Sequence, residues 1–91
     1  MRIRYTTTAR DDLTEIHDYI ARENPVAARK VIRKIRDQIR LLVKHPMLGR
    51  RGQIADTREL IITRYPYIVA YRVGQDAVEI VTVWHTARDY P

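Results

Sequence analysis

The stretch TRELIITRYPYIVAYRVGQDAVEIVTVWHTARDY, residues 57–90, decides the fold of this chain. It holds four of the six tyrosines, the only tryptophan and many β-branched residues, a composition typical of strands. Pro66 interrupts the apolar pattern because proline has no N–H for a central ladder, and Gly74 begins a turn. The stretch therefore predicts three short strands, at residues 60–63, 68–73 and 78–84.

The residues before this stretch are expected to form a cover for one face of the sheet, which such a small sheet needs for stability. Residues 1–5 alternate apolar and basic side chains and predict a short N-terminal strand. Thr7 and Thr8 offer N-caps to a first helix, which has one apolar stripe. Asn24-Pro25 ends that helix and starts a second one, which stops near Lys44. With almost no linker between them, the two helices must fold back as a hairpin.

These patterns predict an α+β fold: a short N-terminal strand and a two-helix hairpin packed on a small antiparallel sheet. The chain has 91 residues and is expected to form a single domain, residues 1–91. It contains no cysteine, which excludes disulfides and thiolate metal sites. No apolar run approaches the roughly 20 residues of a membrane span, and the N-terminus lacks the apolar core of a signal peptide. We therefore expect a cytoplasmic protein that does not contact a membrane.

Basic residues dominate the second helix and the loop after it. Residues 29–51 contain nine basic side chains and one acid, Asp37, in a chain whose formal net charge is +6. This surface is either a solvated helix face, partly neutralised by the acidic first helix, or a binding surface for phosphate or for an acidic protein. The candidate binding residues are Arg29, Lys30, Arg33, Arg36, Arg40, Arg50 and Arg51.

The sequence offers few groups for catalysis. The three histidines lie in different elements without a carboxylate cluster, so we expect no metal and no cofactor, and the chain has no serine nucleophile. The remaining possibility is metal-free RNA cleavage, with His85 as base or acid, Glu59 as a second candidate base, and arginines that hold the phosphate. A strand-end histidine tied to a backbone group is the alternative for His85, and packing is the alternative for the tyrosines. The candidate catalytic residues are Glu59, Arg72, His85 and Tyr90.

Four segments together carry a family resemblance: HPMLG at 45–49, TREL at 57–60, YIVAYRV at 67–73 and WHTARDYP at 84–91. In this order and at this length, the chain resembles the RelE/ParE superfamily of bacterial type II toxins, and it is most similar to the ParE branch. The resemblance implies two helices on a small antiparallel sheet. It also implies an acidic, ParD-like antitoxin that binds the toxin in a hetero-oligomer. Its docking surface is expected to include the groove beside the helix hairpin and the exposed strands, with the basic residues above as candidates for binding it.

The resemblance gives two expectations for activity. ParE-like toxins block DNA gyrase by binding, whereas RelE-like toxins cut mRNA on the ribosome with several basic residues on the sheet. Here no lysine follows Lys44, and the corresponding strand positions are mainly Ile, Val and Thr. We therefore expect a gyrase inhibitor that stabilises plasmids by growth arrest, with a ribosome-dependent mRNA endoribonuclease as the alternative. The candidate target-binding residues are Arg58, Arg72, Trp84, His85, Arg88 and Tyr90.

Overall fold

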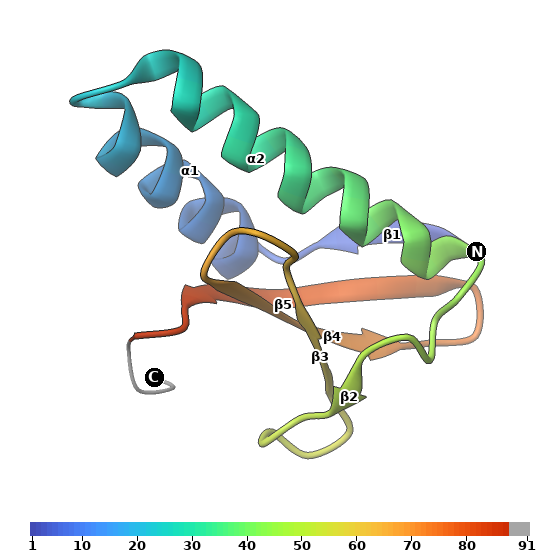
Figure 1. Ribbon diagram of the computed structural model, residues 1–91. Coiled ribbons are helices and arrows are strands. Elements are labelled where there is room, and N and C mark those ends of the chain that lie inside the picture. Colours follow the sequence, from blue (N-terminus) through green and yellow to red (C-terminus); the bar gives the residue numbers. More distant parts are fainter. Residues whose placement is uncertain (88–91) are drawn as a thin grey trace.

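The computed structural model, which describes residues 1–87, has two layers, a helical hairpin and a five-stranded sheet (Figure 1). The helices cover one face of the sheet, as the predicted α+β fold requires. In chain order the elements are β1 (Arg2–Tyr5), α1 (Thr7–Ala21), α2 (Pro25–Arg40), the 3₁₀ turn η1 (Leu41–Val43), β2 (Arg50–Arg51), β3 (Arg58–Ile61), β4 (Tyr67–Val73) and β5 (Ala77–His85).

The sheet has the strand order β1-β5-β4-β3-β2. The three predicted strands are present as β3, β4 and β5 and form the expected antiparallel set, but β3 begins and ends two residues earlier than the predicted 60–63. Two other details differ from the expectation. The N-terminal strand β1 joins the sheet parallel to β5, and the two arginines expected in a loop, Arg50 and Arg51, form the edge strand β2 beside β3.

The N-caps of the two helices agree with the prediction for α2 and differ from it for α1. The N-cap of α1 is Thr6, and neither Thr7 nor Thr8 caps it, because the Thr6 hydroxyl accepts from the Ala9 N–H at 3.0 Å and donates to the Val81 carbonyl at 2.8 Å. The contact with β5 therefore selects the cap. For α2 the prediction is confirmed: Asn24 accepts from the Ala27 N–H at 3.0 Å, and proline begins the helix. No helix within residues 1–87 is long and apolar enough to cross a membrane.

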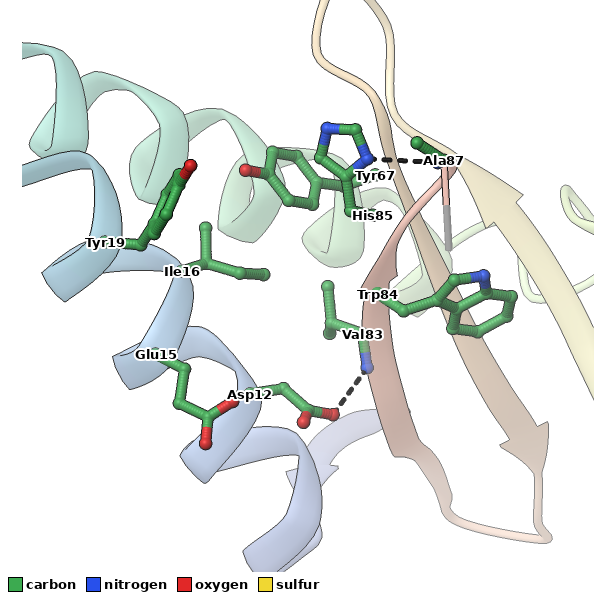
Figure 2. A pocket seen from close by; sticks show the side chains of 9 residues that line it. All are labelled: Asp12, Glu15, Ile16, Tyr19, Tyr67, Val83, Trp84, His85 and Ala87. Carbon is green, nitrogen blue, oxygen red and sulfur yellow. Dashed lines mark hydrogen bonds between the residues drawn. The ribbon is translucent and has the colours of Figure 1, made fainter. Parts of the chain in front are cut away.

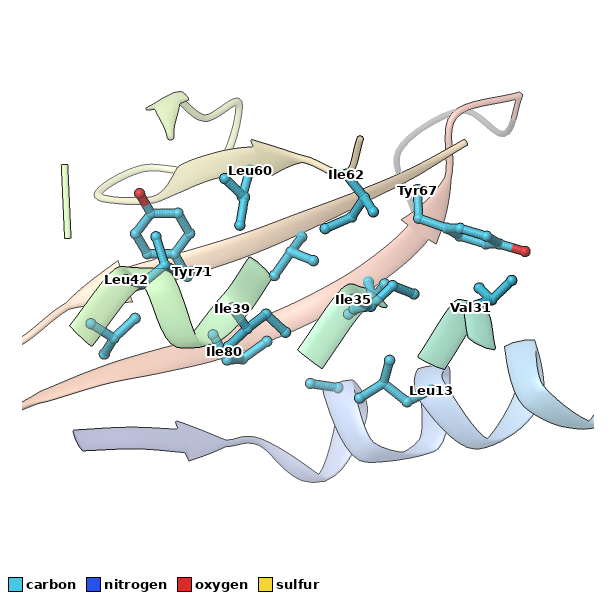
Figure 3. Packing of buried hydrophobic residues seen from close by; sticks show 14 residues of the cluster. Leu13, Val31, Ile35, Ile39, Leu42, Leu60, Ile62, Tyr67, Tyr71 and Ile80 are labelled. Carbon is cyan, nitrogen blue, oxygen red and sulfur yellow. The ribbon is translucent and has the colours of Figure 1, made fainter. Parts of the chain in front are cut away.

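The core lies between the hairpin and the sheet (Figure 3). Ile35 and Ile39 of α2 are fully buried, as are Tyr71 of β4 and Ile80 of β5. Leu13 of α1 is almost fully buried in the same cluster. The apolar stripes of both helices thus face the sheet. The charged residues of each helix lie on the remaining faces, at the surface.

Candidate functional site

A pocket of about 270 Å³ lies between α1 and the ends of β4 and β5 (Figure 2). It is the candidate site because it contains the end of β5, where two of the predicted functional residues, Trp84 and His85, are located. Helix α1 and the two strands contribute carboxylates, aromatic rings and a histidine to it. Its lining residues are Asp12, Glu15, Ile16, Tyr19, Tyr67, Val83, Trp84, His85 and Ala87.

His85 is the most clearly positioned of the predicted residues. It lies opposite Tyr67 in the β4–β5 register, and the two rings meet edge to face with centroids 5.3 Å apart. The Ala87 N–H donates to His85 Nδ1 at 3.0 Å, so a neutral ring carries its proton on Nε2. The structure thus contains the backbone-tied strand-end histidine that the sequence offered as an alternative. In this tautomer Nε2 is a hydrogen-bond donor.

Asp12 joins the two elements that form the pocket. One carboxylate oxygen, Oδ2, accepts from the Val83 N–H at 2.9 Å (Figure 2). The same oxygen accepts from the Thr82 hydroxyl at 2.5 Å. The acidic character of the first helix predicts that Asp12 faces solvent with the other acids of α1, but the side chain is only partly exposed, lies at the border of the apolar stripe and reaches β5. In the sequence, the position of Asp12 one residue before the apolar Leu13 was the available sign of partial burial. It did not indicate which strand the carboxylate contacts.

Glu59 and Arg58 both hold the segment before β3. Glu59 is 4% exposed, and its carboxylate accepts from Arg50 Nη2 at 3.0 Å and from the Gln53 N–H at 3.1 Å. The Arg58 guanidinium donates to the Gly49 carbonyl at 2.7 Å. Through these contacts, Glu59 and Arg58 hold the segment between α2 and β3 in place.

The candidate catalytic residues are not brought together. In the β4–β5 pairing, Tyr67 is opposite His85 and Arg72 is opposite Glu79, so the two ends are separated by about 17 Å of strand. Arg72 also lies 3.9 Å from the Glu79 carboxylate. Trp84 and His85 point to opposite faces of β5 (Figure 2). The remaining candidates, Arg88 and Tyr90, lie outside the described residues.

A second candidate surface is the groove between α1 and α2 on the outer side of the hairpin. It has a volume of about 400 Å³ and an apolar floor at Ile32. Arg36 lies over the Tyr5 ring, 5.4 Å from its centroid, and burial raises the pKa of Tyr5, which therefore stays neutral under the cation. The basic residues of the groove are Arg29, Arg33, Arg36 and Arg40, with Lys30 exposed beside them. Arg50 and Arg51 lie apart from this groove, on the edge strand β2.

Comparison with known protein families identifies the family of this chain. The family described as "ParE toxin of type II toxin-antitoxin system, parDE" matches residues 3–90. The chain belongs to the ParE toxin family. It is thus a toxin of the type II toxin–antitoxin class, as the resemblance in the sequence implied.

Relatives of this ParE-family chain are named as toxins, and one of them carries the name RelE. It is 42% identical over 90 residues to "Putative toxin Y4kP" of Sinorhizobium fredii, with 99% of this chain and 93% of that protein covered. It is 36% identical over 84 residues to "Toxin RelE2" of Caulobacter vibrioides, with 92% of this chain and 93% of that protein covered. The names alone therefore do not separate the two kinds of activity.

Solved structures share the architecture of this ParE-family chain. The chromosomal ParDE toxin–antitoxin system from P. aeruginosa contains a chain with a TM-score of 0.83 and 27% identity, and 93% of this chain and 95% of that chain are covered. The intact E. coli RelBE toxin–antitoxin complex gives a TM-score of 0.68 at 12% identity, with 96% and 98% covered. The second likeness concerns the fold alone.

Proposed function

We propose that this toxin arrests bacterial growth by binding DNA gyrase and that it does not itself cut RNA. The observation that carries the proposal is the separation of the candidate catalytic groups. Metal-free RNA cleavage needs a base, an acid and cations within reach of one phosphate. Glu59 is engaged in a buried ion pair, and Arg72 lies about 17 Å of strand away from the end that holds His85. This arrangement suits a surface for binding better than a site for catalysis.

The pocket between α1 and β5 is the proposed gyrase contact. It combines aromatic and charged side chains at a strand end, and aromatic anchors with a polar surround are typical of protein interfaces. His85 is oriented by Ala87 and supported by the Tyr67 ring. The other target-binding residues predicted from the sequence are Trp84, on the opposite face of β5, Arg58 and Arg72, at more distant positions on the sheet, and Arg88 and Tyr90, outside the described residues.

The groove on the outer side of the hairpin is the proposed docking surface for an acidic, ParD-like antitoxin in a hetero-oligomer. Its arginines surround an apolar floor, which suits a segment with both acidic and apolar side chains. The similarity to a chain of the ParDE toxin–antitoxin system from P. aeruginosa supports an antitoxin partner. A disordered acidic segment would associate fast through charge and then fold on this surface.

The test of the target is pulse labelling of bacteria in the minutes after the toxin is induced without its antitoxin. We expect DNA synthesis to fall first, and purified toxin to inhibit supercoiling by purified gyrase. A collapse of protein synthesis while DNA synthesis continues would favour the alternative, a RelE-like endoribonuclease. In that case, purified toxin should cut mRNA on ribosomes, and Arg72→Ala should abolish the cutting.

A pair of variants tests the proposed contact surface. Replacing His85 and Arg88 together by alanine should lower gyrase inhibition at least about tenfold, because two interface anchors are lost. Gln75→Ala in the exposed turn between β4 and β5 is the matched control and should inhibit like the parent chain. Circular dichroism shows whether both variants fold. Full inhibition by a folded double variant would remove this surface from the proposal.

A further inference from the structure

The turn between β3 and β4 is fixed to helix α2 by side-chain contacts. The Thr63 N–H donates to the side-chain oxygen of Gln38 in α2 at 2.7 Å, and the side-chain nitrogen of Gln38 donates to the Thr63 hydroxyl at 3.1 Å. On the other side of the turn, Tyr65 packs against the core. The residue between these two anchors, Arg64, is therefore held in one position beside α2.

Arg64 adopts a backbone conformation that glycine takes more easily than other residues. Its φ is 76°, in the left-handed region, which costs a residue with a Cβ about 1–2 kcal/mol. The side chain is exposed, and it forms no hydrogen bond or ion pair with any part of the chain that the structure describes. No contact of the guanidinium within residues 1–87 therefore offsets this strain, and the guanidinium is available to a ligand.

A basic pocket of about 240 Å³ lies between this turn and α2, and we call it the α2–turn pocket. Lys30 and Lys34 are four positions apart, about 6 Å along α2, so they lie on the same face of the helix. Arg33 of α2 and Arg64 of the turn bring the number of cations to four. The lining residues are Lys30, Arg33, Lys34, Asp37, Arg64 and Tyr65.

The positive charge of the α2–turn pocket is not balanced within the described chain. Its one carboxylate, Asp37, forms an ion pair at 2.8 Å with Arg40, which lies outside the lining. Among residues 1–87, no carboxylate forms an ion pair with any of the four cations. Like charges four positions apart on a helix, such as Lys30 and Lys34, destabilise it. A bound anion would remove this repulsion.

The surroundings of the pocket favour phosphate over an acidic peptide. The hairpin groove, which shares Arg33 with this pocket, has an apolar floor at Ile32, whereas the only ring in the α2–turn pocket, Tyr65, packs inward against the core. Helix α2 contains no aromatic residue, so it offers no platform for the bases of a single strand. The phosphates of a duplex lie outside its stacked bases and fit both observations.

We propose that the α2–turn pocket binds the phosphate backbone of duplex DNA. Arg64 contacts a phosphate from the turn, and Lys30 and Lys34 contact the same strand from α2. Because every contact is to the backbone, binding does not depend on base sequence and weakens as salt is added. The choice of DNA over RNA rests on the proposed gyrase target, because DNA is the substrate of gyrase, whereas the phosphate site does not depend on that target.

The test measures binding of the purified full chain to a short fluorescent DNA duplex by anisotropy, between about 50 and 200 mM salt. Lys34→Gln should weaken binding at least about threefold at the lower salt. It should also make the slope of log affinity against log salt less steep by about 0.9, the contribution of one phosphate contact. Arg10→Gln removes the same charge from an exposed position on α1, and its affinity and slope should stay close to those of the parent chain.

Arg64→Gly separates binding from folding. Glycine adopts a positive φ without strain, so this variant should be at least as stable as the parent chain in urea unfolding. It should nevertheless bind the duplex at least about threefold more weakly, because one phosphate contact is lost. A lower stability of Arg64→Gly with unchanged DNA binding would assign Arg64 a structural role instead.

Three further outcomes would overturn the proposal. One is DNA binding by Lys34→Gln and Arg64→Gly that is no weaker than binding by Arg10→Gln, because then net charge alone attracts the duplex. Another is tighter binding to the same sequence as a single strand. The third is tighter binding to an RNA duplex of the same sequence, which would assign the pocket to RNA.

The pocket and the gyrase target fail in different experiments, because duplex binding is measured without gyrase. A toxin that shows the expected losses of DNA binding but does not inhibit gyrase would refute the target and support the pocket. A toxin that inhibits gyrase and shows none of these losses would refute the pocket and leave the target in place.

Discussion

At the scale of single residues, Tyr71 shows how one polar group organises a distant segment. Its ring belongs to the core, whereas its hydroxyl bonds to both Pro46 and Gly49, more than twenty positions earlier in the chain. A phenol suits this role because it both donates and accepts. Gly49 is required at this approach, since a Cβ there would lie 2.8 Å from the Tyr71 hydroxyl and from the Glu59 carbonyl.

Tyr71→Phe should lower the free energy of unfolding by about 1–3 kcal/mol, because it leaves the buried Gly49 N–H without its partner. Urea unfolding followed by circular dichroism measures the change. Tyr19→Phe, at an exposed ring, is the control and should change stability little. Equal stability of the two variants would mean that the loop does not depend on the hydroxyl.

The same hydroxyl predicts a pH dependence. Burial raises the pKa of Tyr71 above its ordinary value of 10.0, while the Gly49 N–H and Arg58 oppose that rise. The folded state favours the neutral phenol, so this contribution to stability is complete below pH 10 and is lost as the pH rises through the raised pKa. Unfolding between about pH 9 and pH 11 should show this loss in the parent chain and a smaller loss in Tyr71→Phe. Identical slopes would contradict the assignment.

At the scale of elements, the contact between α1 and β5 depends on one carboxylate as well as on apolar packing. Asp12 accepts from the hydroxyl of Thr82 and from the N–H of Val83 on β5, beyond the end of the β1 pairing. The Asp12 carboxylate therefore accepts the hydrogen bond from the Val83 N–H that a neighbouring strand would otherwise accept at this edge of the sheet. The pocket beside His85 exists because α1 is held at this position.

Asp12→Ala should lower the free energy of unfolding by about 1–3 kcal/mol, because both donors lose their acceptor. Asp11→Ala removes the same charge from an exposed neighbour and serves as the control, with little change. Urea unfolding of the three proteins gives the comparison. In Asp12→Ala, faster hydrogen exchange at Val83 than in the parent chain would locate the effect, and unchanged exchange there would contradict it.

At the scale of the whole molecule, charge is distributed unevenly over a chain whose net charge is +6. The basic residues of α2 line one side of the hairpin groove, and a second basic pair lies on β2. This uneven charge is expected to steer acidic partners toward the chain before any close contact forms.

The charge pattern predicts how an acidic antitoxin associates. Replacing Arg33 and Arg36 by glutamine should slow association several-fold at low salt and reduce its salt dependence, because steering depends on local positive charge. Replacing Arg2 and Arg4, which are exposed on β1, removes the same charge elsewhere and should have the smaller effect. Stopped-flow mixing at two salt concentrations gives the rates. Equal slowing by both pairs would assign the effect to net charge alone.

Local patterns in the sequence determined the elements, because helix caps, apolar stripes and turn residues act over a few positions. The apolar spacing in α2, the Asn24-Pro25 start and the turn at Gly74 all appear in the structure as expected. The family resemblance carried by four short segments is confirmed by the match to the ParE toxin family. The basic surface could also be located from the sequence, since helical periodicity places side chains on a known face.

Only the tertiary structure decided which polar groups meet. Glu59 and His85 both looked available for catalysis, but strand register pairs one with Arg50 and the other with Tyr67. The hydrogen-bond partners of Asp12 lie up to 71 positions away in the chain, and those of Tyr71 lie up to 25 positions away. Such contacts depend on how the elements pack, and a helix or strand pattern contains no information about the partner across a layer. For that reason local patterns were enough to predict the main elements and the charge of this protein, whereas packing set the partners of its buried polar groups.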